Sequence, residues 1–159
     1  MSLRLLEQLT RHWKRGWSLV DLGAGSGILA LAAKCFGAGQ VIGIDNDPAA
    51  ISMAKSNAKL NKFRGISFQL GDVRKSDPPQ ETDVITANLY SHLLIEILPK
   101  LRGSEWLILS GILRSQQNEL VRALKRNRFG IINMKCRGKW VALLAGKAAV
   151  PSAVPRVPT

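Results

Sequence analysis

Residues 20–27 read Val-Asp-Leu-Gly-Ala-Gly-Ser-Gly, and this stretch decides the fold. It overlaps the end of a short apolar segment, residues 18–22, and leads into a run of small apolar residues, 28–36, so it predicts a turn from a strand into a helix. Alternating glycines permit a tight turn and let a ligand approach the backbone without a Cβ in the way. The first N–H groups of the following helix are free to bind a negative group. We therefore expect a ligand site at this turn.

Two features of the turn indicate which ligand it binds. The dinucleotide fingerprint needs a small residue at its last glycine position, where this chain has Ile28. Asp21 stands two residues before Gly23, and a carboxylate there is unfavourable beside a pyrophosphate but suits an ammonium group. S-adenosylmethionine carries an α-amino group and no phosphate. The stretch therefore favours a methyltransferase, and a dinucleotide-dependent oxidoreductase is the more distant alternative.

Segments with strand and helix patterns alternate along the chain. The expected strands are residues 18–22, 40–44, 66–70, 83–87, 106–110, 129–134 and 140–145. The expected helices are residues 3–16, 28–36, 48–60, 91–101 and 115–126, with Pro99 kinking or ending the fourth. This order predicts a doubly wound α/β fold with a mostly parallel seven-stranded sheet and helices on both faces. The last two strands have no helix between them, so we expect an antiparallel pair at one edge.

Acidic residues follow three successive expected strands. Asp21 ends the first, Asp45 ends the second, where a carboxylate can accept two ribose hydroxyls, and Asp72 ends the third. Asp72 could accept the adenine amino group while the Val73 N–H meets a ring nitrogen, although a turn residue is an equally good interpretation. A helix-capping role fits Asp47 better than Asp45. Open α/β sheets bind ligands at this edge, so the three acids predict one site.

Four further stretches carry a resemblance to a known family. They are Gly-Ser-Gly-Ile-Leu-Ala at 25–30, Ala-Asn-Leu at 87–89, Leu-Ser-Gly-Ile-Leu at 109–113 and Gly-Lys-Trp-Val-Ala-Leu at 138–143. The glycine turn and Asp45 resemble class I methyltransferases in general. The whole set closely resembles the bacterial PrmA-type enzymes, which methylate amino groups of a protein of the large ribosomal subunit. The resemblance covers about residues 4–147.

The resemblance implies a cofactor site for S-adenosylmethionine, with S-adenosylhomocysteine as product and no metal. It implies that Asp45 binds the ribose, that Asp72 and Val73 contact adenine, and that Asn88 lies beside the transferring methyl and the incoming amine. The cofactor-binding residues expected on this basis are Asp21, Gly23, Ala24, Gly25, Gly27, Asp45, Asn46, Asp72, Val73 and Asn88. Asn88 is also the expected catalytic residue, because its carbonyl oxygen could accept an amine N–H and orient the lone pair.

The family also has parts that have no counterpart in this sequence. It carries an N-terminal domain that grips the ribosomal protein, and a Gly-Thr-Gly-x-His-x-Thr-Thr type loop that closes over the cofactor. The chain starts at about the first helix of the catalytic domain, so an excised domain and a natural short relative with another target are both open.

The chain carries 23 Lys and Arg against 11 Asp and Glu, a net charge of +12, and residues 125–139 hold six basic residues and no acid. An excess of this kind favours RNA or ribosomal contacts, with plain solubility as the alternative. An RNA methyltransferase is the second candidate, although residues 88–91 read Asn-Leu-Tyr-Ser in place of an Asn-Pro-Pro-Tyr pattern. A non-catalytic cofactor-binding module is the third.

The length of 159 residues suits one domain, expected at residues 1–147, followed by a flexible Pro-rich tail at 148–159. No apolar run reaches the roughly 18 residues that span a membrane, and no secretory signal is evident, so we expect a cytoplasmic protein. Cys35 and Cys136 are expected to be reduced thiols. The sequence gives no indication of the oligomeric state.

Some aromatic and histidine side chains also carry expectations. Trp106 and Trp140 lie in expected strands and are expected in the core, while Tyr90 is expected at the mouth of the pocket. His92, four residues after Asn88, is a conceivable base, but a surface position at a helix start is the better interpretation.

Overall fold

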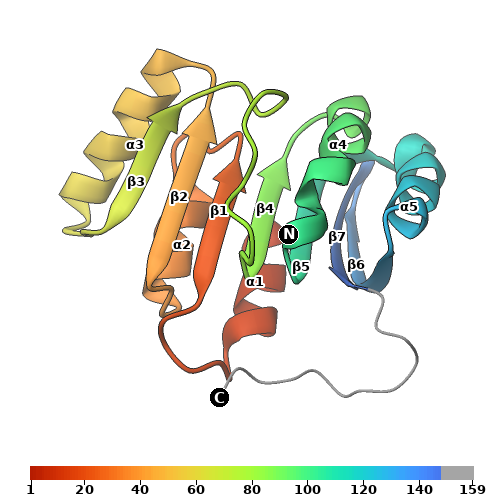
Figure 1. Cartoon of the computed structure of the whole chain (residues 1–159), viewed down its shortest axis with the longest axis horizontal. Coiled ribbons are helices and arrows are strands. Elements are labelled where there is room, and N and C mark those ends of the chain that lie inside the picture. Colours follow the sequence, from red (N-terminus) through yellow and green to blue (C-terminus); the bar gives the residue numbers. More distant parts are fainter. Residues whose placement is uncertain (148–159) are drawn as a thin grey trace.

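The computed structural model describes residues 1–147, and these form a seven-stranded sheet in the order β3-β2-β1-β4-β5-β7-β6 (Figure 1). The strands are β1 (Ser18–Leu22), β2 (Gln40–Asp45), β3 (Ile66–Leu70), β4 (Val84–Asn88), β5 (Trp106–Leu113), β6 (Phe129–Arg137) and β7 (Trp140–Lys147). The first five strands run parallel, and β7 runs antiparallel to both β5 and β6. Strand β7 therefore runs opposite to its neighbours. Strand β6, the other member of the expected antiparallel pair, forms the edge of the sheet.

Helices cover both faces of the sheet, as the alternating pattern predicts. They are α1 (Ser2–Thr10), α2 (Ile28–Cys35), α3 (Pro48–Leu60), α4 (Ser91–Ile97) and α5 (Gln117–Arg126), with 3₁₀ turns η1 (Leu98–Gly103) and η2 (Arg114–Gln116). Buried side chains of α1, α2 and α3 share one core with one face of the sheet, and those of α4, η1 and α5 share a second core with the other. The doubly wound fold is confirmed.

The start of α3 shows how closely local sequence sets an element boundary. Pro48 occupies the first helical position, where its missing N–H costs nothing. The Asp47 side chain accepts a hydrogen bond of 2.8 Å from Ala49 N and so caps the helix, as expected.

Several boundaries differ from the sequence expectations. The first helix ends at Thr10 and not near Gly16, because residues 11, 12 and 14–16 are exposed and offer no apolar face to continue it. The fourth helix ends at Ile97, and Pro99 lies in the 3₁₀ turn that follows. Strands β5, β6 and β7 run longer than expected, because their backbone pairing continues past the glycines at 111 and 146 and through the polar end of β6.

The two tryptophans also differ from expectation. Trp140 is 41% exposed, so its expected place in the core is wrong: it is the first residue of β7, next to the exposed hairpin turn at residues 138–139. Trp106 is half-buried. The tail expected at residues 148–159 lies outside the described residues.

The strand order creates a crevice between β1 and β4. The connection from β1 leaves through α2 on one face of the sheet, whereas the connection from β4 leaves through α4 on the other. At such a switch point the two connections diverge and leave space above the carboxyl ends of the strands, which is where open α/β sheets bind ligands. The glycine turn and Asn88 both lie at this edge.

Candidate functional site

The glycine turn is held in one conformation by β2. Gly23 N and Ala24 N both donate to the Ile44 carbonyl, at 2.8 and 3.0 Å. Gly23, Gly25 and Gly27 have φ values of +71°, +54° and +79°, a region that favours glycine. The turn therefore requires the glycines for its backbone conformation.

Two of these glycines also differ in what surrounds them. A Cβ at Gly25 would meet no atom within 4 Å, so this backbone borders open space that a ligand can enter. A Cβ at Gly27 would lie 2.9 Å from the Phe68 ring and 3.0 Å from the Ala54 Cβ, so Gly27 lets α2 and α3 pack closely on the sheet.

Asp45 is oriented by two backbone donors at the end of β2. One carboxylate oxygen accepts from Gly25 N at 2.8 Å and the other from Asp47 N at 3.0 Å. Each carboxylate oxygen can accept more than one hydrogen bond. Asp45 therefore links the glycine turn to the start of α3 and keeps acceptor capacity for a ligand.

A cleft of about 230 Å³ opens beside Asp45 at the carboxyl ends of the strands. Its lining brings together Gly23, Asp45, Asn46, Asp72, Val73 and Asn88, all expected from the sequence, with Gly71, Arg74, Leu89 and Leu93. Leu93 could have been found as the residue one helical turn after Leu89. Arg74 gave no sequence signal, and in the structure it pairs with Glu96 at 3.2 Å.

Asp21 lies beneath the glycine turn and does not line the cleft. Its side chain is buried, and Thr86 Oγ1 donates to Asp21 Oδ1 at 2.6 Å. Burial raises the pKa of the Asp21 carboxyl to about 7, and the hydrogen bond from Thr86 opposes that rise. Ala24, Gly25 and Gly27 shape the turn without lining the cleft.

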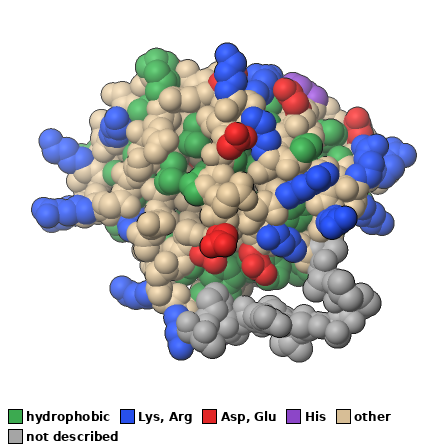
Figure 2. Space-filling model, in the orientation of Figure 1, with side chains coloured by type: hydrophobic (Ala, Val, Ile, Leu, Met, Phe, Trp, Pro, Cys, Tyr) green, Lys and Arg blue, Asp and Glu red, His purple; other side chains and the backbone are tan. Residues whose placement is uncertain are grey.

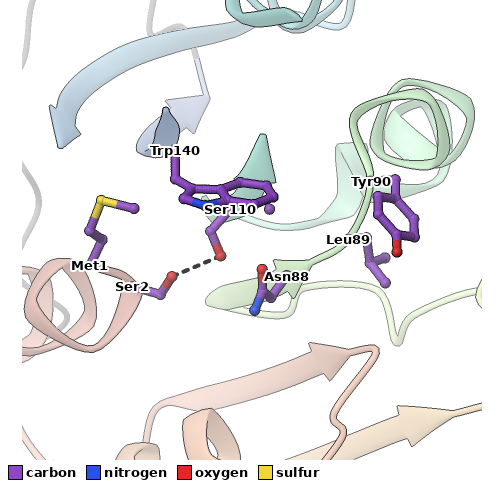
Figure 3. Close-up of a pocket in the computed structure, with 8 residues that line it drawn as sticks. Met1, Ser2, Asn88, Leu89, Tyr90, Ser110 and Trp140 are labelled. Atoms are coloured by element: carbon purple, nitrogen blue, oxygen red, sulfur yellow. Dashed lines mark hydrogen bonds between the residues drawn. The ribbon is translucent and has the colours of Figure 1, made fainter. Parts of the chain in front are cut away.

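A larger cavity of about 550 Å³ adjoins the cleft. It is lined by Met1, Ser2, Asn88, Leu89, Tyr90, Ser110, Gly111 and Trp140. In Figure 3, Met1 and Ser2 lie on one side, Leu89 and Tyr90 on the other, and Ser2 Oγ donates to Ser110 Oγ at 2.8 Å. Asn88 and Leu89 line both spaces, so they form the boundary between cleft and cavity.

Gly111 fixes the position of this boundary. It has φ +83°, and a Cβ there would lie 2.6 Å from the Leu89 carbonyl oxygen and 2.9 Å from Asn88 Oδ1. The absence of a side chain therefore lets β5 approach the Asn88 side chain closely. Leu89 in turn packs over Gly23, because a Cβ at Gly23 would lie 2.5 Å from Leu89 Cδ2.

The aromatic residues near the cavity have distinct positions. Tyr90 is 72% exposed at the cavity mouth, where it was expected. Its ring stacks on that of His92 with centroids 6.0 Å apart. His92 is exposed in the first turn of α4 and lines neither space, which agrees with a surface histidine.

Within residues 1–147, no group of three His, Cys, Asp or Glu side chains is placed to hold a metal ion. Cys35 and Cys136 are both exposed and form no disulfide. Among the same residues, no helix has the length and apolar character needed to cross a membrane.

Comparison with known proteins identifies the family. A family model described as ribosomal protein L11 methyltransferase (PrmA) matches residues 1–148. The chain belongs to the PrmA family. The match spans every element that forms the cleft and the cavity.

Individual PrmA relatives give the extent of the similarity. The chain is 36% identical over 151 residues to the ribosomal protein L11 methyltransferase of Desulforapulum autotrophicum, covering 91% of this chain and 48% of the relative. It is 36% identical over 148 residues to that of Lactobacillus johnsonii, covering 90% and 46%. The crystal structure of the ribosomal protein L11 methylase from Lactobacillus delbrueckii subsp. bulgaricus superposes with a TM-score of 0.81 at 28% identity, covering 93% of this chain and 78% of that one. The chain thus spans about half the length of the curated relatives it matches.

Proposed function

We propose that this chain is the catalytic domain of an S-adenosylmethionine-dependent methyltransferase that modifies amino groups of a ribosomal protein. One observation carries the proposal: a cleft at the carboxyl ends of β1 to β4, with both carboxylate and apolar side chains, meets a larger open cavity at Asn88. A group-transfer enzyme needs two adjoining spaces of this kind, one for the donor and one for the acceptor. Membership of the PrmA family supports the choice of donor and acceptor.

The cleft residues fit S-adenosylmethionine better than a dinucleotide. The oriented Asp45 carboxylate suits two ribose hydroxyls, and Asp72 adds a second acceptor for an amino group. Two carboxylates in one cleft would repel a pyrophosphate. Val73, Leu89 and Leu93 supply apolar surface for an adenine ring. The open backbone at Gly25 leaves room for the methionine part.

Asp21 contributes to the cofactor site through the turn above it. Its buried carboxyl sits under the backbone that would face the α-amino group, and its pKa of about 7 leaves it partly ionised at neutral pH. Asp21 is therefore a positioning residue, which holds the turn and adds negative potential beneath it.

Asn88 orients the acceptor at the boundary between the two spaces. When bound, S-adenosylmethionine supplies a methyl group on a positively charged sulfur, which is already a good electrophile. The amine must arrive neutral, its extra proton having gone to solvent, and Asn88 Oδ1 would accept one of its N–H groups so that its lone pair faces the methyl group. The N–C bond would form as the bond from the methyl group to sulfur breaks, with neutral S-adenosylhomocysteine as the leaving group, and the methylated amine would release a proton to solvent. Holding two reactants in line can be worth effective molarities on the order of 10⁵ M.

The relatives are named for ribosomal protein L11, and we assign an acceptor of this kind to the present chain. Tyr90 and Trp140 border the cavity and provide aromatic surface for the stem of an amino-bearing side chain. RNA is the less favoured acceptor, because Leu89 follows Asn88 where base-modifying relatives would place Pro-Pro-Tyr. A non-catalytic module is also less favoured, because Asp45 and Asn88 both face the cleft.

The test is transfer of a radiolabelled methyl group from S-adenosylmethionine to purified ribosomal protein L11. We expect Asn88→Ala to lower the turnover rate by about 100-fold, because orientation is lost. Asn61→Ala is the matched control and should retain full activity, since Asn61 is exposed after the end of α3 and lines neither space. Full transfer by Asn88→Ala would remove the proposed role of Asn88, and transfer to ribosomal RNA in place of protein would support the alternative acceptor.

A further inference from the structure

We propose that a basic pocket at the C-terminal end of α5 binds the phosphodiester backbone of RNA. The pocket has a volume of about 570 Å³ and is lined by Arg102, Arg126, Asn127, Arg128, Phe129 and Lys147. Four of these six side chains are cationic and none is acidic. Figure 2 shows Lys and Arg side chains gathered on the side of the molecule that carries α5.

The cations of this pocket come from separate elements. Arg102 belongs to η1, Arg126 ends α5, and Lys147 ends β7. Within residues 1–147, none of the four cations forms an ion pair, and the three pairs that occur there involve Arg74 and Lys100 instead. Like charges brought together without partners repel one another, and a bound anion relieves that repulsion.

Local contacts leave N–H donors of these cations available: Lys147 Nζ donates one long hydrogen bond of 3.5 Å to the Gly103 carbonyl oxygen and has two further N–H groups. Arg102 Nε donates to Asn127 Oδ1 at 3.1 Å, which fixes the side chain and leaves its other N–H groups for a ligand. Glu105 accepts a backbone hydrogen bond of 3.0 Å from Lys147 N, and its side chain does not line the pocket.

Helix electrostatics account for part of this cluster. Cations in the last turn of a helix interact favourably with its dipole, and this explains Lys125 and Arg126 at the end of α5. It does not explain Arg102 and Lys147, which reach the same pocket from other elements. Convergence on one concave surface therefore points to a ligand.

Arginine favours phosphate as that ligand. Its planar guanidinium offers several N–H donors in a fork that matches phosphate oxygens, and three of the four cations are arginines. A chain with a net charge of +12 attracts a polyanion at long range. The choice of RNA rests on the proposed function, because a ribosomal protein acceptor lies next to ribosomal RNA.

The pocket lies at the amino ends of the parallel strands, whereas the candidate methyl-transfer site lies at their carboxyl ends. Pairing of Trp106 with Gly146 places the end of β7 at the start of β5, whereas Asn88 pairs with Ser110 further along β5. Trp106 and Ser110 are roughly 13 Å apart along the strand. The phosphates held in this pocket therefore do not lie at the methyl-transfer site, and the pocket acts in docking.

The experiment measures binding of a fluorescently labelled single-stranded RNA by anisotropy over a range of salt concentrations, without cofactor. The test variant is Arg126→Gln with Lys147→Gln. The control, Lys55→Gln with Lys59→Gln, removes the same charge from exposed positions on α3, which lies at the other end of the sheet. Thermal melting of each variant checks the fold, and Arg126→Gln alone is the milder version, since Arg126 is exposed.

We expect the test variant to reduce the slope of log affinity against log salt by about 1.4, because two phosphate contacts are lost, and Arg126→Gln alone by about 0.7. The control should keep the wild-type slope. Equal reductions in test and control variants, binding of a polyglutamate peptide in place of RNA, or no RNA binding would each overturn the proposal. Titration of the same proteins with S-adenosylhomocysteine separates this outcome from failure of the cofactor site.

Discussion

Replacing Asp21 with Asn should remove a pH dependence from the stability of the fold. The folded chain holds this carboxyl at a pKa of about 7 because it is buried, against 3.8 as the ordinary value. At a pH between those values, the native state keeps a proton that the unfolded state has released. The free energy of unfolding therefore falls as the pH rises through this window, and it levels off above about pH 7.

The size of the effect follows from the width of the window. Each pH unit over which the native state holds one extra proton lowers the free energy of unfolding by about 1.4 kcal/mol. Between about pH 5 and pH 8 the wild type should lose roughly 3 kcal/mol through Asp21, with the decline slowing near pH 7, where the native carboxyl is itself half ionised. An Asn side chain has no proton to release, and its carbonyl oxygen can still accept the hydrogen bond from Thr86.

Urea unfolding of both proteins at about pH 5, 6, 7 and 8 measures this dependence. We expect a declining free energy of unfolding in the wild type and a decline smaller by roughly 3 kcal/mol in Asp21→Asn. The comparison uses the change in the free energy of unfolding with pH and not its absolute value, because Asn also alters the packing of a buried site. Parallel curves for the two proteins, or a wild type that gains stability toward pH 8, would refute the reasoning.

Two glycine substitutions give further predictions. Gly27→Ala should lower the free energy of unfolding by about 3 kcal/mol, because alanine is strained at a φ of +79° and its Cβ would clash with the Phe68 ring. Urea titration measures the loss, and a loss below about 1 kcal/mol would contradict the prediction. Gly111→Ala should reduce the methyl-transfer rate by about 100-fold by displacing Asn88 and Leu89, and unchanged turnover would show that Asn88 needs no fixed position.

The fold was predictable because its signals are local. The glycine turn, the Asp47-Pro48 helix start and the apolar strands each depend on neighbouring residues, and the alternation of elements restricts the topology. The acidic residues of the cleft, Asp45 and Asp72, were predictable because parallel strands deliver their carboxyl ends to one side of the sheet, whereas Arg74 gave no sequence signal.

Other features depend on contacts between distant segments. Trp140 was expected in the core from its strand pattern, but its exposure is set by where the hairpin ends. The basic run at residues 125–139 divides in the structure: Arg126 and Arg128 join Arg102 and Lys147, whereas Lys135 and Arg137 line another pocket with Arg4. Burial of Asp21 likewise depends on Thr86 in a neighbouring strand.

Calorimetric titration of S-adenosylhomocysteine into the purified chain tests the central claim most directly, with Asp45→Ala and Asp47→Ala alongside. Asp47→Ala is the control because it loses the cap of α3, worth about 1 kcal/mol of stability, without touching the cleft. We expect wild-type binding, near-wild-type affinity in the control, and affinity at least about 10-fold weaker in Asp45→Ala. No binding by the folded wild type, or equal affinity in Asp45→Ala, would contradict the cofactor site.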